Sequence, residues 1–133
     1  MYKNILVCYD GSENGNRAIQ EVPKIAKTNS TVTILQIISS YVENIEIGDS
    51  HKHLDVKESF SHKLEPFKKI HPHTEVKILN GPVARQIIQQ TKSGNYDLVI
   101  VGSRGLGGIK KHVFGSVSSK VLAESPIPVL VVK

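Results

Sequence analysis

The sequence predicts an α/β protein with a doubly wound, five-stranded parallel sheet and helices on both of its faces. Short apolar runs alternate with helical patterns along the whole chain, which is typical of strand-helix-strand units with right-handed crossovers. The first run, from Asn4 to Tyr9, is almost continuously apolar, as expected for a central strand that is covered on both faces. The length of 133 residues fits one domain spanning residues 1–133.

The first part of the chain contains two of the predicted strands. The first strand leads into Asp10-Gly11-Ser12, which combines a turn with a helix N-cap. The helix that follows has one apolar face, formed by Ala18, Ile19, Val22, Ile25 and Ala26. Pro23 removes a backbone hydrogen bond from this helix, so we expect a local kink between Ile19 and Pro23. The second strand, Thr31 to Ile38, is rich in β-branched residues.

The stretch after the second strand is less regular. Residues 39–50 lack periodicity and are expected to form a surface loop. A helix is predicted for residues 51–70 from three apolar positions, namely Phe60, Leu64 and Phe67. Pro66 should end or kink this helix near its last turn.

The second half of the chain carries three further strands, predicted at Glu75–Leu79, Tyr96–Val101 and Val129–Val132. Two helices connect these strands. The helix introduced by Gly81-Pro82 presents an apolar face formed by Ala84, Ile87, Ile88 and Thr91. The last helix, centred on residues 117–123, should bury Val117, Val121 and Leu122.

Composition narrows the classes of function. The formal charge of +5, from 17 Lys and Arg against 12 Asp and Glu, favours anionic ligands. Nucleic acid is not expected as a partner, because aromatic residues make up only 5% of the chain and no recognised binding motif occurs. No membrane span or signal peptide is visible, so a cytoplasmic protein is expected. The single cysteine, Cys8, should be a small buried side chain.

Metal binding and nucleophilic catalysis receive little support. Four of the six histidines form two pairs, His51 with His53 and His71 with His73. No cysteine joins these pairs, and we expect them to be exposed at loop edges rather than to bind metal. Three serines near predicted strand or helix ends lack the context of a nucleophile elbow and an assignable His-Asp partner, namely Ser12, Ser103 and Ser116.

A glycine-rich stretch, residues 101–108, connects the fourth strand to a helix that starts near Ser116. Its glycines let the backbone approach a ligand, because no Cβ intervenes. The new helix offers unpaired N–H groups and the positive end of its dipole, to which Ser116 and Ser118 can add hydroxyl donors. The stretch therefore predicts a phosphate-binding loop, the alternative being an ordinary flexible loop. It is not a Walker A motif, which needs Gly-Lys-Ser or Gly-Lys-Thr, and Lys110 replaces the third glycine of a Rossmann fingerprint.

The spacing of Gly102, two residues, Gly105, nine residues and then Gly115-Ser116 resembles the nucleotide-binding signature of the universal stress protein family. The resemblance extends to Asp10-Gly11-Ser12, to Asn80-Gly81-Pro82 and to the closing strand. It implies an adenine nucleotide alpha hydrolase-like fold and an ATP-binding regulatory module involved in stress response. By the same resemblance Ile37 forms the apolar wall and a backbone contact of the adenine; unaided, the sequence would place Ile37 in the core.

Fold and motif point to the same crevice. A doubly wound sheet binds its ligand beyond the carboxyl ends of the strands, where the strand order reverses. In the expected order 3-2-1-4-5, this point lies between the strands that end at Asp10 and Gly102. We expect Asp10 beside the base or ribose, since polyphosphate would repel it; the alternative is that it caps the next helix. Arg104 either pairs with phosphate or is a solvent-facing loop arginine.

The residues predicted to contact the nucleotide are Asp10, Ile37, Gly102, Arg104, Gly105, Gly115, Ser116 and Val117. Mg²⁺, if present, would be held mainly by the phosphates. Two other functions stay open: a slow ATPase, although no base that positions water is evident, and a protein-interaction module with no physiological nucleotide. The apolar edge strand Val129–Val132 predicts a homodimer, and the family resemblance points to pairing of this strand with its twofold mate.

Overall fold

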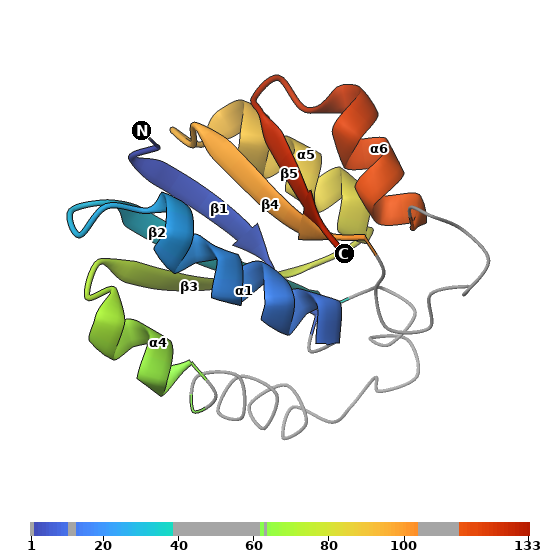
Figure 1. Ribbon diagram of the computed structural model, residues 1–133. Coiled ribbons are helices and arrows are strands. Elements are labelled where there is room, and N and C mark those ends of the chain that lie inside the picture. Colours follow the sequence, from blue (N-terminus) through green and yellow to red (C-terminus); the bar gives the residue numbers. More distant parts are fainter. Residues whose placement is uncertain (1, 11–12, 39–61, 63, 104–114) are drawn as a thin grey trace.

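The computed structural model describes residues 2–10, 13–38, 62, 64–103 and 115–133. Its sheet contains β1 (Asn4–Cys8), β2 (Thr31–Ile38), β3 (Thr74–Asn80), β4 (Leu98–Gly102) and β5 (Val129–Val132). The connecting helices are α1 (Glu13–Ile25), α4 (Glu65–Ile70), α5 (Val83–Ser93) and α6 (Ser116–Glu124). All strand pairs are parallel, in the order β3-β2-β1-β4-β5 (Figure 1). This confirms the predicted sheet, strand order and fold class.

Helices cover both faces of the sheet: α1 and α4 lie on one side, and α5 and α6 on the other (Figure 1). Successive residues of a strand point to opposite faces. Ile5 and Val7 therefore pack toward the α1 and α4 side, while Leu6 packs toward α5 and α6, and all three are fully buried. Burial on both faces explains why the strand lacks the alternation of a half-exposed sheet. No helix in the described part of the chain is long and apolar enough to cross a membrane.

The central strand β1 lies between β2 and β4. Val7 is in register with Ile34 of β2 and with Ile100 of β4. The chain leaves β1 toward β2 and β3, and later returns to the other side of β1 to form β4. The strand order consequently reverses between β1 and β4, which is where a doubly wound sheet opens a crevice at its carboxyl edge.

Pro66 lies in the first turn of α4, where proline is suited because its missing N–H has no acceptor. Whether it ends or kinks the longer predicted helix 51–70 stays a prediction, because most of that helix lies outside the described residues. The predicted burial of Leu122 is wrong. Leu122 is 45% exposed, because Ser118 and Val121, one turn apart, form the buried side of α6. The helix α1 continues through Pro23 to Ile25, and the kink expected there stays a prediction. The predicted loop 39–50 and most of the predicted helix 51–70 lie outside the described residues.

His71 is also unlike the exposed histidine that the sequence suggested. It follows α4 directly, its ring lies 5.0 Å from that of Phe67, and it is only 5% exposed. Neither ring nitrogen has a hydrogen-bond partner among the described residues. Because Phe67 belongs to the apolar cluster under α1 and α4, the neighbouring imidazole is carried into the same apolar surroundings.

Candidate functional site

Asp10 and Ile37 lie where β1 and β2 reach the carboxyl edge of the sheet. The N–H of Tyr9 donates to the carbonyl of Leu35 over 2.9 Å, so the chain stays beside β2 until just before Asp10. Ile37 is two residues beyond Leu35 and packs, half-buried, against the apolar cluster under α5 and α6. The structure thus brings both predicted residues to one edge, and the partial exposure of Ile37 leaves a side available to a ligand.

The first turn of α1 packs closely against this edge. A Cβ on Gly15 would lie 3.0 Å from Oδ1 of Asp10, and a Cβ on Gly102 would lie 3.0 Å from Cβ of Asn14. Such contacts are tighter than nine in ten real Cβ contacts, so a side chain at either position would push its neighbour away. Glycine therefore lets the helix approach the ends of β1 and β4 closely. The predicted ligand residue Gly102 therefore has a packing role that the sequence did not reveal.

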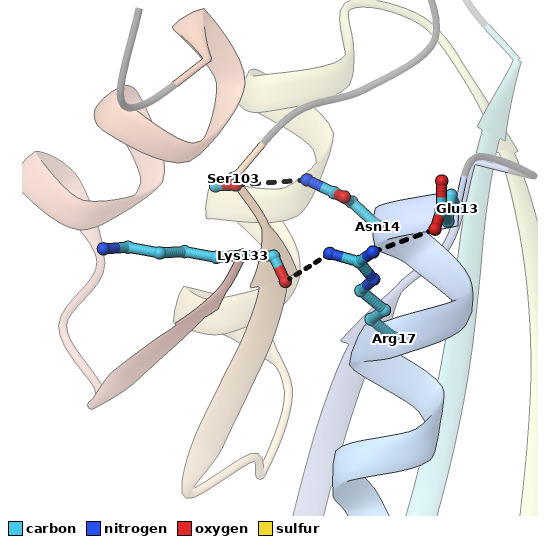
Figure 2. Close-up of polar contacts among 5 residues, drawn as sticks. All are labelled: Glu13, Asn14, Arg17, Ser103 and Lys133. Carbon is cyan, nitrogen blue, oxygen red and sulfur yellow. Dashed lines mark hydrogen bonds and ion pairs between the residues drawn. The ribbon is translucent and has the colours of Figure 1, made fainter.

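Ser103, the residue after β4, joins four elements at the crevice. It is 3% exposed, and its hydroxyl accepts a hydrogen bond from Nδ2 of Asn14 over 3.1 Å (Figure 2). Its N–H donates to the carbonyl of Val132, and its own carbonyl accepts from the N–H of Gly115, each over 2.7 Å. Ser103 thereby fixes α1, the end of β5 and the start of α6 relative to the end of β4.

Sequence reasoning missed this role for Asn14 and Ser103. The two residues are 89 positions apart in the chain, and the spacing of the glycine motif gives no sign that they meet. The one signal in the sequence is that Ser103, a small polar residue, directly follows an apolar strand.

Arg17 makes a second link between α1 and β5. Its guanidinium donates to Oε1 of Glu13 over 2.9 Å and to the main-chain oxygen of Lys133 over 3.2 Å (Figure 2). The side chains of Arg17 and Glu13 are 51% and 79% exposed, so their ion pair contributes little to stability. The bond from Arg17 to Lys133 connects the first turns of α1 with the end of β5.

The N-terminus of α6 supplies donors for an anion. Gly115 is the N-cap residue, without a side-chain capping bond, and its carbonyl accepts the N–H of Ser119 over 3.0 Å. The N–H groups of Ser116 and Val117 precede this first intrahelical bond and so have no acceptor within the helix. Together with the helix dipole they suit a phosphate oxygen. Ser116 is exposed, in keeping with a ligand contact.

Ser118 does not fit its predicted role as a hydroxyl donor to phosphate. Its side chain is 1% exposed, and its hydroxyl donates to the carbonyl of Gly115 over 3.1 Å. The hydroxyl is therefore used inside the protein, where it satisfies a buried polar group. The predicted contacts Arg104 and Gly105 lie outside the described residues.

The electrostatic environment of the crevice argues against a reactive thiol. Burial and the nearby charge of Asp10 raise the pKa of Cys8 to about 12, and the same two causes raise the pKa of Tyr9. Both groups stay neutral near pH 7, so Cys8 offers no thiolate nucleophile. Within the described residues, no three His, Cys, Asp or Glu side chains lie together as metal ligands would.

The whole chain, residues 1–133, matches the model of the Universal stress protein family. The chain belongs to this family. A universal stress protein of Thermus aquaticus, named for its place in the 3′ region of a QAH/OAS sulfhydrylase, is 30% identical to this chain. The alignment is 142 positions long and covers 100% of both chains. Hypothetical protein MJ0577 is similar in structure, with 29% identity, a TM-score of 0.84, and coverage of 100% of this chain and 96% of that one.

Two more distant relatives of this universal stress protein were solved with nucleotides. One is a universal stress protein in complex with cAMP, with 22% identity and a TM-score of 0.70 over 99% of this chain and 97% of the other. The second is an Arabidopsis thaliana family member with AMP bound, with 22% identity and a TM-score of 0.62 over 98% of this chain and 91% of the other. At this identity the likeness shows the shared fold.

Proposed function

We propose that this universal stress protein binds an adenine nucleotide, with ATP as the first candidate, and acts as a regulatory module in stress response. The observation that carries the proposal is the pair of hydrogen bonds by which Ser103, at the end of β4 where the strand order reverses, joins Asn14 and Gly115. These bonds hold the N–H groups of the first turn of α6, which have no acceptor within the helix, at the same edge of the sheet as Asp10. The N–H groups suit the phosphates of a nucleotide, and the carboxylate of Asp10 suits its ribose or base.

In this proposal each part of the nucleotide meets residues of suitable chemistry. The phosphates lie against the N–H groups of Ser116 and Val117 and against the loop from Gly102 to Gly115, in which Arg104 and Gly105 remain predicted contacts. Asp10 accepts a hydrogen bond from the ribose or the base, away from the phosphates that would repel it. Ile37 supplies an apolar surface for the adenine. Mg²⁺, when it accompanies the nucleotide, is held mainly by phosphate oxygens.

The relatives support the class of ligand. The family members solved with AMP and with cAMP share the adenine base, and both have the fold of this chain. The choice of ATP among adenine nucleotides rests on the complete spacing of the glycine motif, which resembles the family's nucleotide-binding signature.

The nucleotide carried by the purified protein tests this proposal. The protein is denatured, and the released small molecules are separated and identified by mass spectrometry. Recovery of ATP, or binding of added ATP by protein that was purified empty, is the expected result. Neither recovery nor binding would leave a protein-interaction module as the remaining function. Steady-state release of phosphate by the loaded protein would instead point to a slow ATPase.

We also propose that two copies of this chain pair through β5. Among the described strands, β5 pairs with β4 alone, so its outer edge carries unpaired N–H and C=O groups. Val129, Leu130 and Val131 are only partly buried although all three are apolar. An apolar edge of this kind favours a second strand, and an isologous twofold contact would cover both edges at once.

A further inference from the structure

The helices α5 and α6 pack against each other on one face of the sheet (Figure 1). A groove lies between their side chains. Its volume is about 410 Å³, and it is lined by Arg85, Ile88, Gln89, Lys92, Lys120 and Glu124. We call this feature the α5/α6 groove. None of its residues belongs to the predicted nucleotide site, so it needs an explanation of its own.

The α5/α6 groove carries an excess of unpaired positive charge. Arg85, Lys92 and Lys120 are exposed, and in the described part of the chain none of them forms an ion pair or a hydrogen bond. Arg17 and Lys24 on α1, by contrast, each pair with a carboxylate one turn away. The single carboxylate of the groove, Glu124, cannot balance three cations. The groove is therefore suited to a negatively charged ligand or partner.

We propose that the α5/α6 groove docks an acidic segment of a partner protein. Arg85 and Lys92 are seven residues apart on α5, which places them about 10 Å apart along the helix axis. A single phosphate or carboxylate group does not reach both. Carboxylates spaced along an extended chain do, because each residue of such a chain advances about 3.3 Å.

The two remaining polar residues favour a peptide over a polyphosphate or a nucleic acid. Gln89 lies between Arg85 and Lys92, and its side-chain amide can both donate to and accept from a peptide backbone. Glu124 also lines the groove, where its carboxylate repels a polyphosphate, which is charged at every unit, but can accept a hydrogen bond from a peptide backbone N–H. The net charge of +5 adds long-range attraction for an acidic partner.

The α5/α6 groove and the predicted nucleotide site use different residues. The helices α5 and α6 lead into the starts of β4 and β5, so Lys92 and Glu124 lie toward the amino edge of the sheet. Arg85, in the first turn of α5, lies toward the carboxyl edge, which also holds Asp10 and the N-terminus of α6. The groove therefore extends from the side of the nucleotide site toward the opposite edge.

Fluorescence anisotropy with a short, labelled, Glu-rich peptide tests the proposal on the full chain. The groove variant combines Arg85→Glu, Lys92→Glu and Lys120→Glu. The matched control combines Lys27→Glu, Lys68→Glu and Lys69→Glu, which changes the net charge equally at the end of α1 and on α4, on the other face of the sheet. We expect the groove variant to bind about tenfold more weakly or worse, and the control to lose little.

Three results would overturn the assignment. If the wild-type protein does not bind the peptide at low salt, the groove is not a docking site for acidic segments. Equal losses in the groove variant and the control would show attraction by net charge alone. Tripolyphosphate that binds the groove more tightly than the peptide would assign the groove to a small polyanion. If circular dichroism shows that the triple variant is misfolded, the single change Lys120→Ala tests the same contact, with Lys69→Ala as its control.

Discussion

Replacing Gly102 by alanine should both destabilise the domain and weaken nucleotide binding. The new Cβ would lie 3.0 Å from Cβ of Asn14 and 3.3 Å from its carbonyl carbon and oxygen. Because comfortable carbon–carbon contacts begin at about 3.5 Å, the first turn of α1 must move about 0.5 Å away from β4. That movement stretches the bond from Asn14 to Ser103, now 3.1 Å, beyond useful length.

The two effects set the expected magnitude. Overpacking of a close contact costs about 1–3 kcal/mol, and a weakened hydrogen bond costs about 1 kcal/mol. We expect a loss of about 2 kcal/mol in the free energy of unfolding, measured by urea denaturation, and a Tm lower by about 6 °C for a chain of this size. The affinity for ATP, measured by calorimetry on the folded variant, should fall about tenfold, since a displacement of this size in a preorganised site is costly.

Gly94→Ala is the matched control. A Cβ at Gly94 would lie 2.3 Å from Cε2 of Tyr96 and 2.9 Å from the carbonyl of Gln90, so this variant should also be destabilised. Gly94 follows α5 at the amino edge of the sheet, far from the crevice. Its affinity for ATP should stay within about twofold of wild type. A Gly102→Ala protein of wild-type stability, or equal losses of affinity in both variants, would refute the reasoning.

Three further predictions concern other parts of the fold. His71→Leu should raise the free energy of unfolding by about 1 kcal/mol in urea titrations, because two buried nitrogens without partners are removed; a destabilised variant would contradict this. Cys8, whose pKa of about 12 lies above its unfolded value of about 9, keeps its proton in the folded state while the unfolded chain loses it. Stability should therefore fall as the pH rises from about 9 toward 12, and Cys8→Ala should reduce that fall; an identical pH profile for both proteins would exclude this cause. Val131→Lys should convert a dimer to a monomer in light scattering, because a charge on the β5 edge opposes strand pairing; a variant that stays dimeric would rule out this interface.

Most of the fold followed from the sequence because local patterns determine it. The apolar run around Leu6 predicts a strand buried on both faces, and the faces of α1 and α5 follow from helical spacing. The prediction of a buried helix face fails where two neighbouring residues in one turn could both be buried. In α6 the sequence favours burial of Leu122, but the sheet buries Ser118 and Val121, and the hydroxyl of Ser118 is satisfied within the helix.

The candidate site was predictable only in its backbone features. Asp10, Gly102 and Gly115 are marked by the ends of predicted strands and by the motif spacing. The contact of Asn14 with Ser103 joins residues 89 positions apart, and nothing in either local sequence specifies it. Likewise, the burial of His71 depends on how α4 packs on the sheet, which periodicity in a helix of six residues cannot define.

Calorimetric titration of ATP into wild type and Gly115→Val tests the central claim most directly. Gly115 has φ −69° and ψ 163°, an extended conformation that valine adopts readily, so the variant should fold. Its side chain would occupy the space at the N-terminus of α6 that we assign to phosphate. We predict that wild type binds ATP and that the folded variant does not. Unchanged affinity for ATP in a folded Gly115→Val protein would contradict the proposed site.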